Sequence, residues 1–237
     1  DVRDDGSCLL NMDNFNYATG LTMCNDSAWQ QLFGIPPRKS HDELDQGYMD
    51  MALAIQEITE EIVLKLASTA RALTGCKHLV MAGGVALNCV VNGKLLRSGL
   101  FEDIWIQPAS GDAGGGLGAA LAGWHIWMDE PRVPVSPDQM KGALLGPEYS
   151  DQDIRRTARQ YKAPYQEYND FKNLCTDVSR LISEGNVVGW FQGRMEYGPR
   201  ALGNRSILGD PRQPDMQKRL NLKIKYREGF RPFAPSV

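Results

Sequence analysis

The chain of 237 residues is longer than most single domains, which permits one large domain but slightly favours two smaller ones. Its hydrophobic content of 42% and charged content of 23% are typical of an ordinary soluble globular protein. A net charge of −3 excludes a general attraction to nucleic acid or to an anionic membrane surface. No apolar run approaches the roughly 20 residues that span a bilayer, so we expect no membrane segment.

Five widely spaced cysteines without a C-x-x-C pair argue against a zinc ribbon, a dithiol redox site and a dense disulfide framework. We therefore expect free thiols and a cytoplasmic location. The chain starts without methionine and ends without a capping or tail signal, so we also expect it to be a fragment of a longer protein.

Residues 1–44 have no convincing period and predict loops with short strands. From Asp45 to Leu73 apolar residues recur at three- and four-residue spacing, for example at Ile55, Ile58 and Ile62, which predicts a long amphipathic helix. Gly75 stands where a helix C-cap is expected.

Two short apolar runs, 79–82 and 103–107, predict strands, and each is followed by a glycine-rich loop and a helix. This order is typical of an α/β domain with helices packed on a largely parallel sheet. Prolines gather at 129–137, where we place a boundary between domains 1–130 and 138–237. Beyond it, the pattern predicts helices near 150–161 and 171–183 and a strand at 187–191.

The glycine loops are candidate phosphate-binding sites, because bare backbone N–H groups at a helix start let a phosphate approach. Gly83-Gly84 and Gly114-Gly115-Gly116 are the candidates, and the alternative is that such glycines only permit tight turns. The spacing at 114–119 fits a dinucleotide fingerprint formally, but no second strand ends in the required acidic residue.

Asp112 stands between two glycines after a predicted strand, where it would ligate a metal or serve as an N-cap of the next helix. The three histidines, His41, His78 and His125, lack metal-ligand spacing and are interpreted as structural or surface residues. Trp124 and Trp127 lie at helical spacing and predict core packing.

Arg194, Arg200 and Arg205 form the sharpest feature, since three guanidinium groups within a dozen residues, interleaved with Gly and Pro, predict a shaped loop that binds an anion. Ser206 adds a hydroxyl and Glu196 an internal counter-ion. A second basic group follows with Lys223, Lys225, Arg227 and Arg231. A solvated charged face is the alternative for both groups, and the acidic total counts against RNA binding.

The run from Gly193 to Arg212, GRMEYGPRALGNRSILGDPR, followed by N-x-x-x-K-x-R-E-x-x-R-P-F-A-P-S from Asn221 to Ser236, resembles the NodU/CmcH family of carbamoyltransferases. GGVALN at 83–88 and SGDAGGG at 110–116 resemble upstream motifs of the same family. The resemblance covers most of the chain after about residue 45.

What the resemblance implies is the second lobe of an actin-like (ASKHA) domain followed by a truncated YrdC-like α+β domain. It implies a reaction in which carbamoyl phosphate and ATP give carbamoyl adenylate, whose carbamoyl group passes to a hydroxyl of a small sugar or natural-product acceptor. Arg194, Arg200, Lys225 and Arg227 would be catalytic. The residues that would hold the nucleotide are Gly83, Gly84, Asn88, Gly111, Gly114, Arg205 and Ser206.

The same resemblance makes Asp112 a ligand of a divalent metal, iron or magnesium. The family's H-x-x-x-H metal pair is absent from this chain, and so is the first actin-like lobe. We therefore expect the isolated chain to be inactive in complete transfer. An actin-like kinase or phosphohydrolase, or a non-enzymatic nucleotide- or RNA-binding module, are the alternatives.

Overall fold

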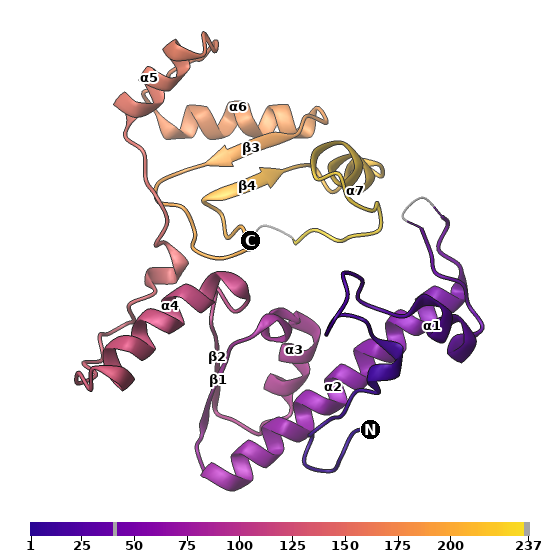
Figure 1. Cartoon of the computed structure of the whole chain (residues 1–237). Helices are drawn as coiled ribbons and strands as arrows, with labels where there is room; N and C mark the ends of the chain where they lie inside the picture. The colour runs from indigo at the N-terminus through magenta and orange to yellow at the C-terminus, as the bar shows by residue number, and fades with distance from the viewer. Residues whose placement is uncertain (40–41, 235–237) are drawn as a thin grey trace. The chain divides into compact units, whose positions relative to one another are not determined.

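The computed structural model describes residues 1–39 and 42–234, whose helices and strands are traced in Figure 1. The chain divides into two compact units, Asp1–Gln107 and Pro108–Val237, and each is described by itself. The boundary expected at residues 129–137 stays a prediction. His41 and the last three residues, 235–237, lie outside the described residues.

The first unit contains one long helix and a small parallel sheet. Its elements are η1 (Met12–Asn14), α1 (Asp26–Phe33), α2 (Gln46–Thr74), β1 (His78–Met81), η2 (Gly84–Leu87), α3 (Cys89–Arg97) and β2 (Asp103–Ile106). The predicted long helix is confirmed as α2. Its start is capped by Asp45, whose side chain accepts the N–H of Tyr48, and its end by Gly75 at a φ of 66°.

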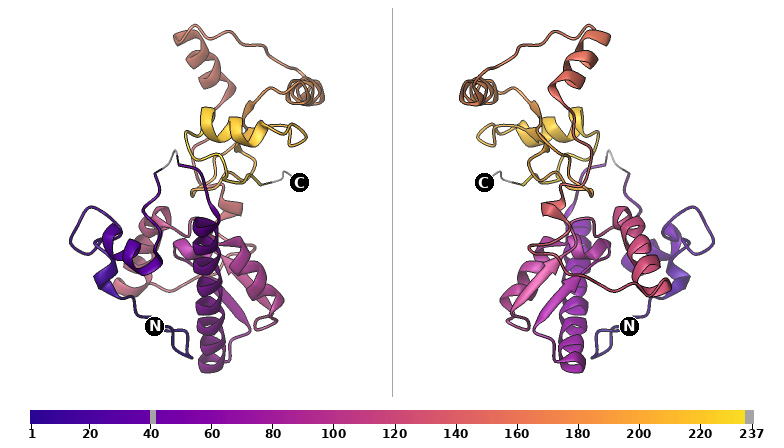
Figure 2. Two further views of the ribbon diagram at one scale, coloured as in Figure 1. Left: turned by 90° about the vertical axis from the view of Figure 1, so that its right-hand side faces the viewer. Right: turned by 90° about the vertical axis from the view of Figure 1, so that its left-hand side faces the viewer.

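β1 and β2 pair in parallel, with Leu79 opposite Ile104, so the predicted β-α-β order is confirmed for these two strands. Their side chains alternate, and Leu79 and Ile104 pack against a core that includes Leu95 and Phe101. In both views of Figure 2, α2 runs alongside the strands. The core of this unit therefore lies between the sheet, α2 and α3.

The second unit combines several helices with an antiparallel hairpin. Its elements are α4 (Asp112–Ala122), η3 (Gly123–Trp127), η4 (Lys141–Ala143), α5 (Asp151–Gln160), α6 (Phe171–Ser183), β3 (Val188–Phe191), β4 (Arg205–Leu208), α7 (Met216–Arg219) and η5 (Leu220–Ile224). The two predicted helices and the predicted strand are confirmed as α5, α6 and β3. A capping box between Ser150 and Asp153 starts α5.

Helix α1 contradicts the prediction of loops with short strands for residues 1–44, and it is capped by Asn25 and Gly34. The strand β4 was also missed, because Arg205 and Ser206 were assigned to the arginine-rich loop. β3 and β4 pair antiparallel, with Phe191 opposite Arg205 and Trp190 opposite Ser206. Phe171 of α6 meets Trp190 edge to face at 6.2 Å between ring centroids, which fixes that helix on β3.

The predicted core role of Trp124 and Trp127 is wrong, because their side chains are 50% and 89% exposed. Helix α4 passes here into the π-helical turn η3. Helical spacing places the two tryptophans on one face, but it does not show whether another element packs on that face. His78 is exposed and His125 is half-buried, with its Nδ1 2.9 Å from the carbonyl oxygen of Glu130, so both fit the interpretation as structural or surface residues.

Both units mix helices with two-stranded sheets, which is compatible with an α/β protein. The more specific assignment, an actin-like lobe followed by a YrdC-like domain, stays a prediction. Within the described part of the chain, no helix is both long and apolar enough to cross a membrane.

Candidate functional site

A pocket of about 600 Å³ opens on the β3–β4 hairpin of the second unit, a volume within the range of small-molecule sites. It is lined by Gly189, Trp190, Phe191, Gly198, Pro199, Ala201, Arg205, Ser206, Ile207 and Lys225. Three predicted site residues, Arg205, Ser206 and Lys225, are thereby brought together although twenty residues of chain separate them. Two cations and a hydroxyl in the lining of one pocket favour an anionic ligand.

The loop between the two strands is shaped by glycine. Gly198 has a φ of 122°, and a Cβ added there would lie 2.9 Å from the carbonyl oxygen of Pro108. The adjacent Tyr197 donates its hydroxyl to the carbonyl oxygen of Ala113 and its backbone N–H to Ala143 at 2.6 Å. The loop is therefore held against the start of α4.

Arg205 is the best-placed guanidinium, because it lines the pocket and remains 38% exposed. It donates to the carbonyl oxygen of Gly198 at 3.2 Å and lies 3.9 Å from the carboxylate of buried Glu196, which confirms Glu196 as an internal counter-ion. Burial raises the pKa of Glu196, but backbone N–H groups, among them those of Leu202 and Asn204, outweigh it and hold the pKa below its ordinary value.

The other two predicted arginines do not line this pocket. Arg194 turns toward another segment, where it donates to the carbonyl oxygen of Gly146 at 2.8 Å and pairs with Glu148 at 3.2 Å. Arg200 is exposed, and no partner for it is found among the described residues. Arg194 is thus engaged in holding residues 146–148, whereas Arg200 is available to a ligand.

Buried Asn221 organises the second basic group. Its side-chain oxygen accepts from Arg227 Nε at 2.6 Å, and its amide donates to the carbonyl oxygens of Gly229 and Arg231. Arg227 also stacks over Phe233 at 4.9 Å. Lys225 reaches the pocket while Arg227 fixes the chain behind it.

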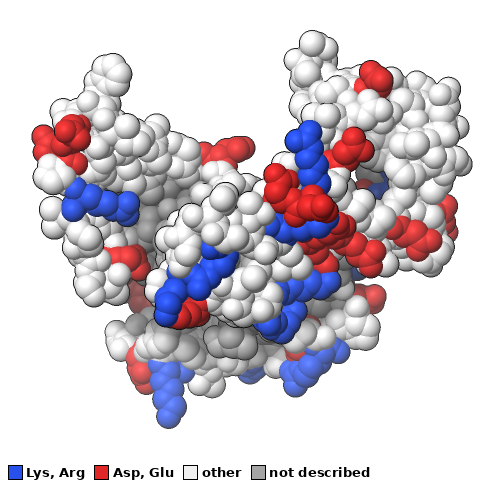
Figure 3. All heavy atoms as spheres, turned by 90° about the horizontal axis from the view of Figure 1, so that it is seen from below, with Lys and Arg blue, Asp and Glu red and all other residues white. Residues whose placement is uncertain are grey.

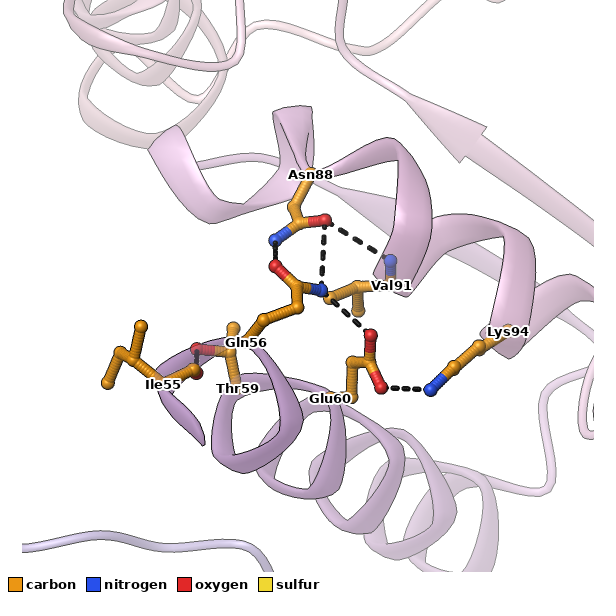
Figure 4. A network of polar contacts seen from close by, with 7 residues as sticks. All are labelled: Ile55, Gln56, Thr59, Glu60, Asn88, Val91 and Lys94. Atoms are coloured by element: carbon orange, nitrogen blue, oxygen red, sulfur yellow. Dashed lines mark hydrogen bonds and ion pairs between the residues drawn. The ribbon is translucent and has the colours of Figure 1, made fainter. Parts of the chain in front are cut away.

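Asn88, predicted to bind nucleotide, serves as the N-cap of α3, and its side-chain oxygen accepts the N–H of Val91 at 3.2 Å. Figure 4 shows how its amide also meets Gln56 of α2, at 2.8 Å, in a network that continues to Glu60 and Lys94. The hydrogen bond from Gln56, followed by that from Lys94, lowers the pKa of Glu60. This network joins α2 to α3.

The four candidate glycines differ in what a side chain would meet. At Gly83, Gly84 and Gly111 a Cβ would have no neighbour within 4 Å, which leaves room for a ligand. At Gly114 it would lie 2.0 Å from the carbonyl oxygen of Ala109, so close backbone packing explains that glycine.

Sequence comparison places this geometry in a family. Residues 1–121 match the family described as Carbamoyltransferase N-terminus, and residues 179–237 match Carbamoyltransferase C-terminus. The chain belongs to the carbamoyltransferase family. The arginine-rich hairpin and Lys225 fall within the C-terminal match, and Asp112 falls within the N-terminal one.

Several relatives are similar over most of this chain. An uncharacterized protein of Synechocystis is 53% identical over 100% of the chain, and the nodulation protein NolNO of Sinorhizobium fredii is 41% identical over 87%. The 3'-hydroxymethylcephem-O-carbamoyltransferase of Amycolatopsis lactamdurans is 32% identical over 77%. The aligned regions cover only 38%, 30% and 32% of these three relatives, so the chain spans about a third of their length.

Asp112, the predicted metal ligand of this family member, is the exposed first residue of α4, where Gly111 takes the N-cap position. Across residues 1–39 and 42–234, no three His, Cys, Asp or Glu side chains form a group that would hold a metal ion. The described residues alone therefore do not fit a divalent metal, and we derive no chemistry from one.

Proposed function

We propose that this chain supplies the phosphate-handling pocket of an ATP-dependent O-carbamoyltransferase. In the proposed reaction, water hydrolyses carbamoyl phosphate to carbamate and inorganic phosphate. A carbamate oxygen then attacks the α-phosphorus of ATP and expels pyrophosphate. A hydroxyl of a small-molecule acceptor then attacks the carbamoyl carbon of the adenylate and expels AMP. The reaction belongs to the full-length protein, and the isolated chain is expected not to complete it.

The single observation that carries the proposal is the convergence of Arg205, Ser206 and Lys225 on one pocket. Arginine and lysine stabilise the charge that develops on a departing pyrophosphate, and a positioned hydroxyl adds a donor. Family membership supports carbamoyl transfer as the chemistry served by these groups.

The acceptor is proposed to be a small molecule with a free hydroxyl, because the relative from Amycolatopsis lactamdurans is named for O-carbamoylation of a hydroxymethylcephem. ATP is the proposed cosubstrate of the hairpin pocket. Gly83 and Gly84 in the first unit, and Gly111 in the second, are each proposed as an open backbone position for a nucleotide phosphate. A divalent metal at Asp112 would need its other ligands from the full-length protein outside the described residues. A cytoplasmic location is proposed from the absence of a disulfide framework among the described residues.

The test is exchange of labelled pyrophosphate into ATP, dependent on carbamoyl phosphate, measured on the full-length protein. We expect Arg205→Ala and Lys225→Ala each to reduce exchange by about 10²-fold, as loss of one preorganised donor does in other enzymes. Arg180→Ala is the matched control, because Arg180 is exposed on α6 and pairs with Glu184. ATP turnover that ignores carbamoyl phosphate would instead indicate an actin-like phosphohydrolase.

RNA binding is a further alternative, and the face drawn in Figure 3 does not favour it. On the face drawn in Figure 3, Lys and Arg side chains are interspersed with Asp and Glu. A phosphate backbone is bound by a continuous basic patch. Salt-dependent RNA binding that falls on replacing Arg194 and Arg200 would contradict the proposed enzyme.

A further inference from the structure

Glu196 is a carboxylate buried behind the pocket, with no exposed side-chain surface. Its Oε1 accepts the backbone N–H groups of Leu202 at 2.7 Å and Asn204 at 2.8 Å. Both belong to the loop that leads into β4. Through Oε1, Glu196 therefore fixes the backbone immediately before Arg205.

The second oxygen of Glu196 is engaged differently. Oε2 is buried and makes no hydrogen bond to any residue that the structure describes, and it lies 3.9 Å from Arg205 Nε. A buried carboxylate oxygen without a hydrogen bond is unfavourable and rare in native proteins. The charge attraction between Oε2 of Glu196 and the guanidinium of Arg205 compensates for this missing hydrogen bond.

Arg212 provides a comparison, because its guanidinium is hydrogen-bonded directly to a buried carboxylate. Arg212 gives Nε and Nη2 to both oxygens of buried Asp210 at 2.7 to 3.0 Å, so those donors are used. The guanidinium of Arg205 makes one hydrogen bond among the described residues, to the carbonyl oxygen of Gly198, and a guanidinium has five N–H groups. Most donors of Arg205 remain free for a ligand.

We propose that Glu196 is a positioning residue for Arg205. Its carboxylate holds the guanidinium by charge at a distance beyond hydrogen bonding, so the N–H donors of Arg205 stay available to the phosphate chain bound in the pocket. This inference rests on the proposed function, since that function identifies the anion as the pyrophosphate portion of ATP.

A positioning role and a purely electrostatic role of Glu196 predict opposite effects of its substitution on anion binding. Glu196→Gln removes a negative charge near the pocket, and by electrostatic field alone it would tighten binding of an anion. If Glu196 positions Arg205, the same substitution weakens binding, because the guanidinium loses the group that orients it. Gln keeps an oxygen for Leu202 and Asn204, so the loop backbone retains its anchor.

The experiment is calorimetric titration of inorganic pyrophosphate into the full-length protein, as wild type, E196Q, R205A and the double variant. We expect E196Q to weaken binding by about tenfold and to have no further effect in the R205A background, since coupled neighbours are non-additive. D210N, which removes a buried carboxylate paired outside the pocket, is the control and should bind within about twofold of wild type.

Tighter or unchanged binding by E196Q, equal weakening in both backgrounds, or no binding by the wild type would each overturn the inference. If E196Q does not fold, E196D, which keeps the charge but draws it back by one methylene, replaces it in the same cycle. Carbamoyl-phosphate-dependent exchange in the wild type tests the proposed function separately. If the wild type shows this exchange but E196Q binds pyrophosphate as tightly as the wild type, Glu196 does not position Arg205. The proposed function would still hold.

Discussion

The side-chain oxygen of Asn221 accepts a hydrogen bond of 2.6 Å from Arg227 Nε, and the two residues also pair through their backbones at 3.0 Å. The amide group of Asn221 holds the carbonyl oxygens of Gly229 and Arg231. One fully buried side chain thus satisfies three partners in the segment that presents Lys225 to the pocket.

Asn221→Ala should destabilise the protein by about 2–3 kcal/mol, because it leaves buried polar partners without hydrogen bonds. Urea unfolding followed by circular dichroism measures the loss. Asn221→Asp is the matched variant, since it keeps an acceptor for Arg227 but replaces the donor to the two carbonyl groups. Stability of N221A equal to wild type would show that water replaces these contacts.

The glycines of the β2–α4 region provide a second prediction. Gly114→Ala should destabilise by about 1–3 kcal/mol, since its Cβ would lie 2.0 Å from the carbonyl oxygen of Ala109. Gly111→Ala should change stability by less than about 0.5 kcal/mol, because the position is open and its φ is −82°. Thermal unfolding compares the two variants.

ATP binding by the G111A variant then shows whether Gly111 only permits a turn or also lets a phosphate approach. If Gly111 lets a phosphate approach, G111A weakens ATP binding while its stability stays normal. Unchanged affinity in G111A would assign this glycine to loop geometry alone. A stable G114A protein would contradict the close packing against Ala109.

The sequence predicted those elements whose pattern is local. The 3.6-residue period and Gly75 located α2, and apolar runs located β1, β2 and β3. β4 was missed because Arg205 and Ser206 are polar residues on a short strand whose pairing depends on β3. Helical spacing likewise could not show whether a neighbour covers Trp127.

The candidate site was predictable as a set of residue types but not as a geometry. The sequence pattern identified the arginines, Ser206 and Lys225 as candidates. It could not show that Arg194 contacts Gly146 and Glu148 and does not line the pocket. The role of Asn221 depends on which backbone carbonyl groups converge on it, and no periodicity encodes that convergence. The N-x-x-x-K-x-R motif was the available signal.

Asn88 provides a third prediction, because a helix cap needs only a side-chain oxygen, which Ser also has, whereas a nucleotide-binding role would depend on the Asn side chain itself. Asn88→Ala should lower stability by about 1 kcal/mol through loss of the cap on α3. Asn88→Ser keeps a capping oxygen and should recover most of that loss, although it gives up the amide contact with Gln56. Thermal unfolding of both variants measures the recovery.

ATP titration of the same variants assigns the role. Weaker ATP binding by a stable N88S protein would place Asn88 in the nucleotide site. Equal affinity in N88S and wild type would leave it a structural cap joined to α2.

Acid sensitivity is the fourth prediction, and it follows from two buried carboxylates. The hydrogen bonds from Arg212 hold the pKa of Asp210 below its ordinary value of 3.8, and the pKa of Glu196 lies below 4.5 for the reasons given above. A depressed pKa in the folded state contributes stability that is fully present above the ordinary value. That contribution is lost as the pH falls below it toward the folded-state pKa.

Stability should therefore stay flat with respect to these two groups from pH 7 to about 5 and fall below about 4.5. Urea midpoints measured between pH 7 and 3 test this. D210N and E196Q each remove one titrating carboxylate, so each variant should start less stable at pH 7 and lose less on acidification than the wild type. Lys77 and Glu102 form an exposed ion pair in the first unit, and Glu102→Gln is the control for general acid effects. An acid limb of wild-type size in both D210N and E196Q would show that these two carboxylates keep ordinary pKa values and do not cause the acid sensitivity.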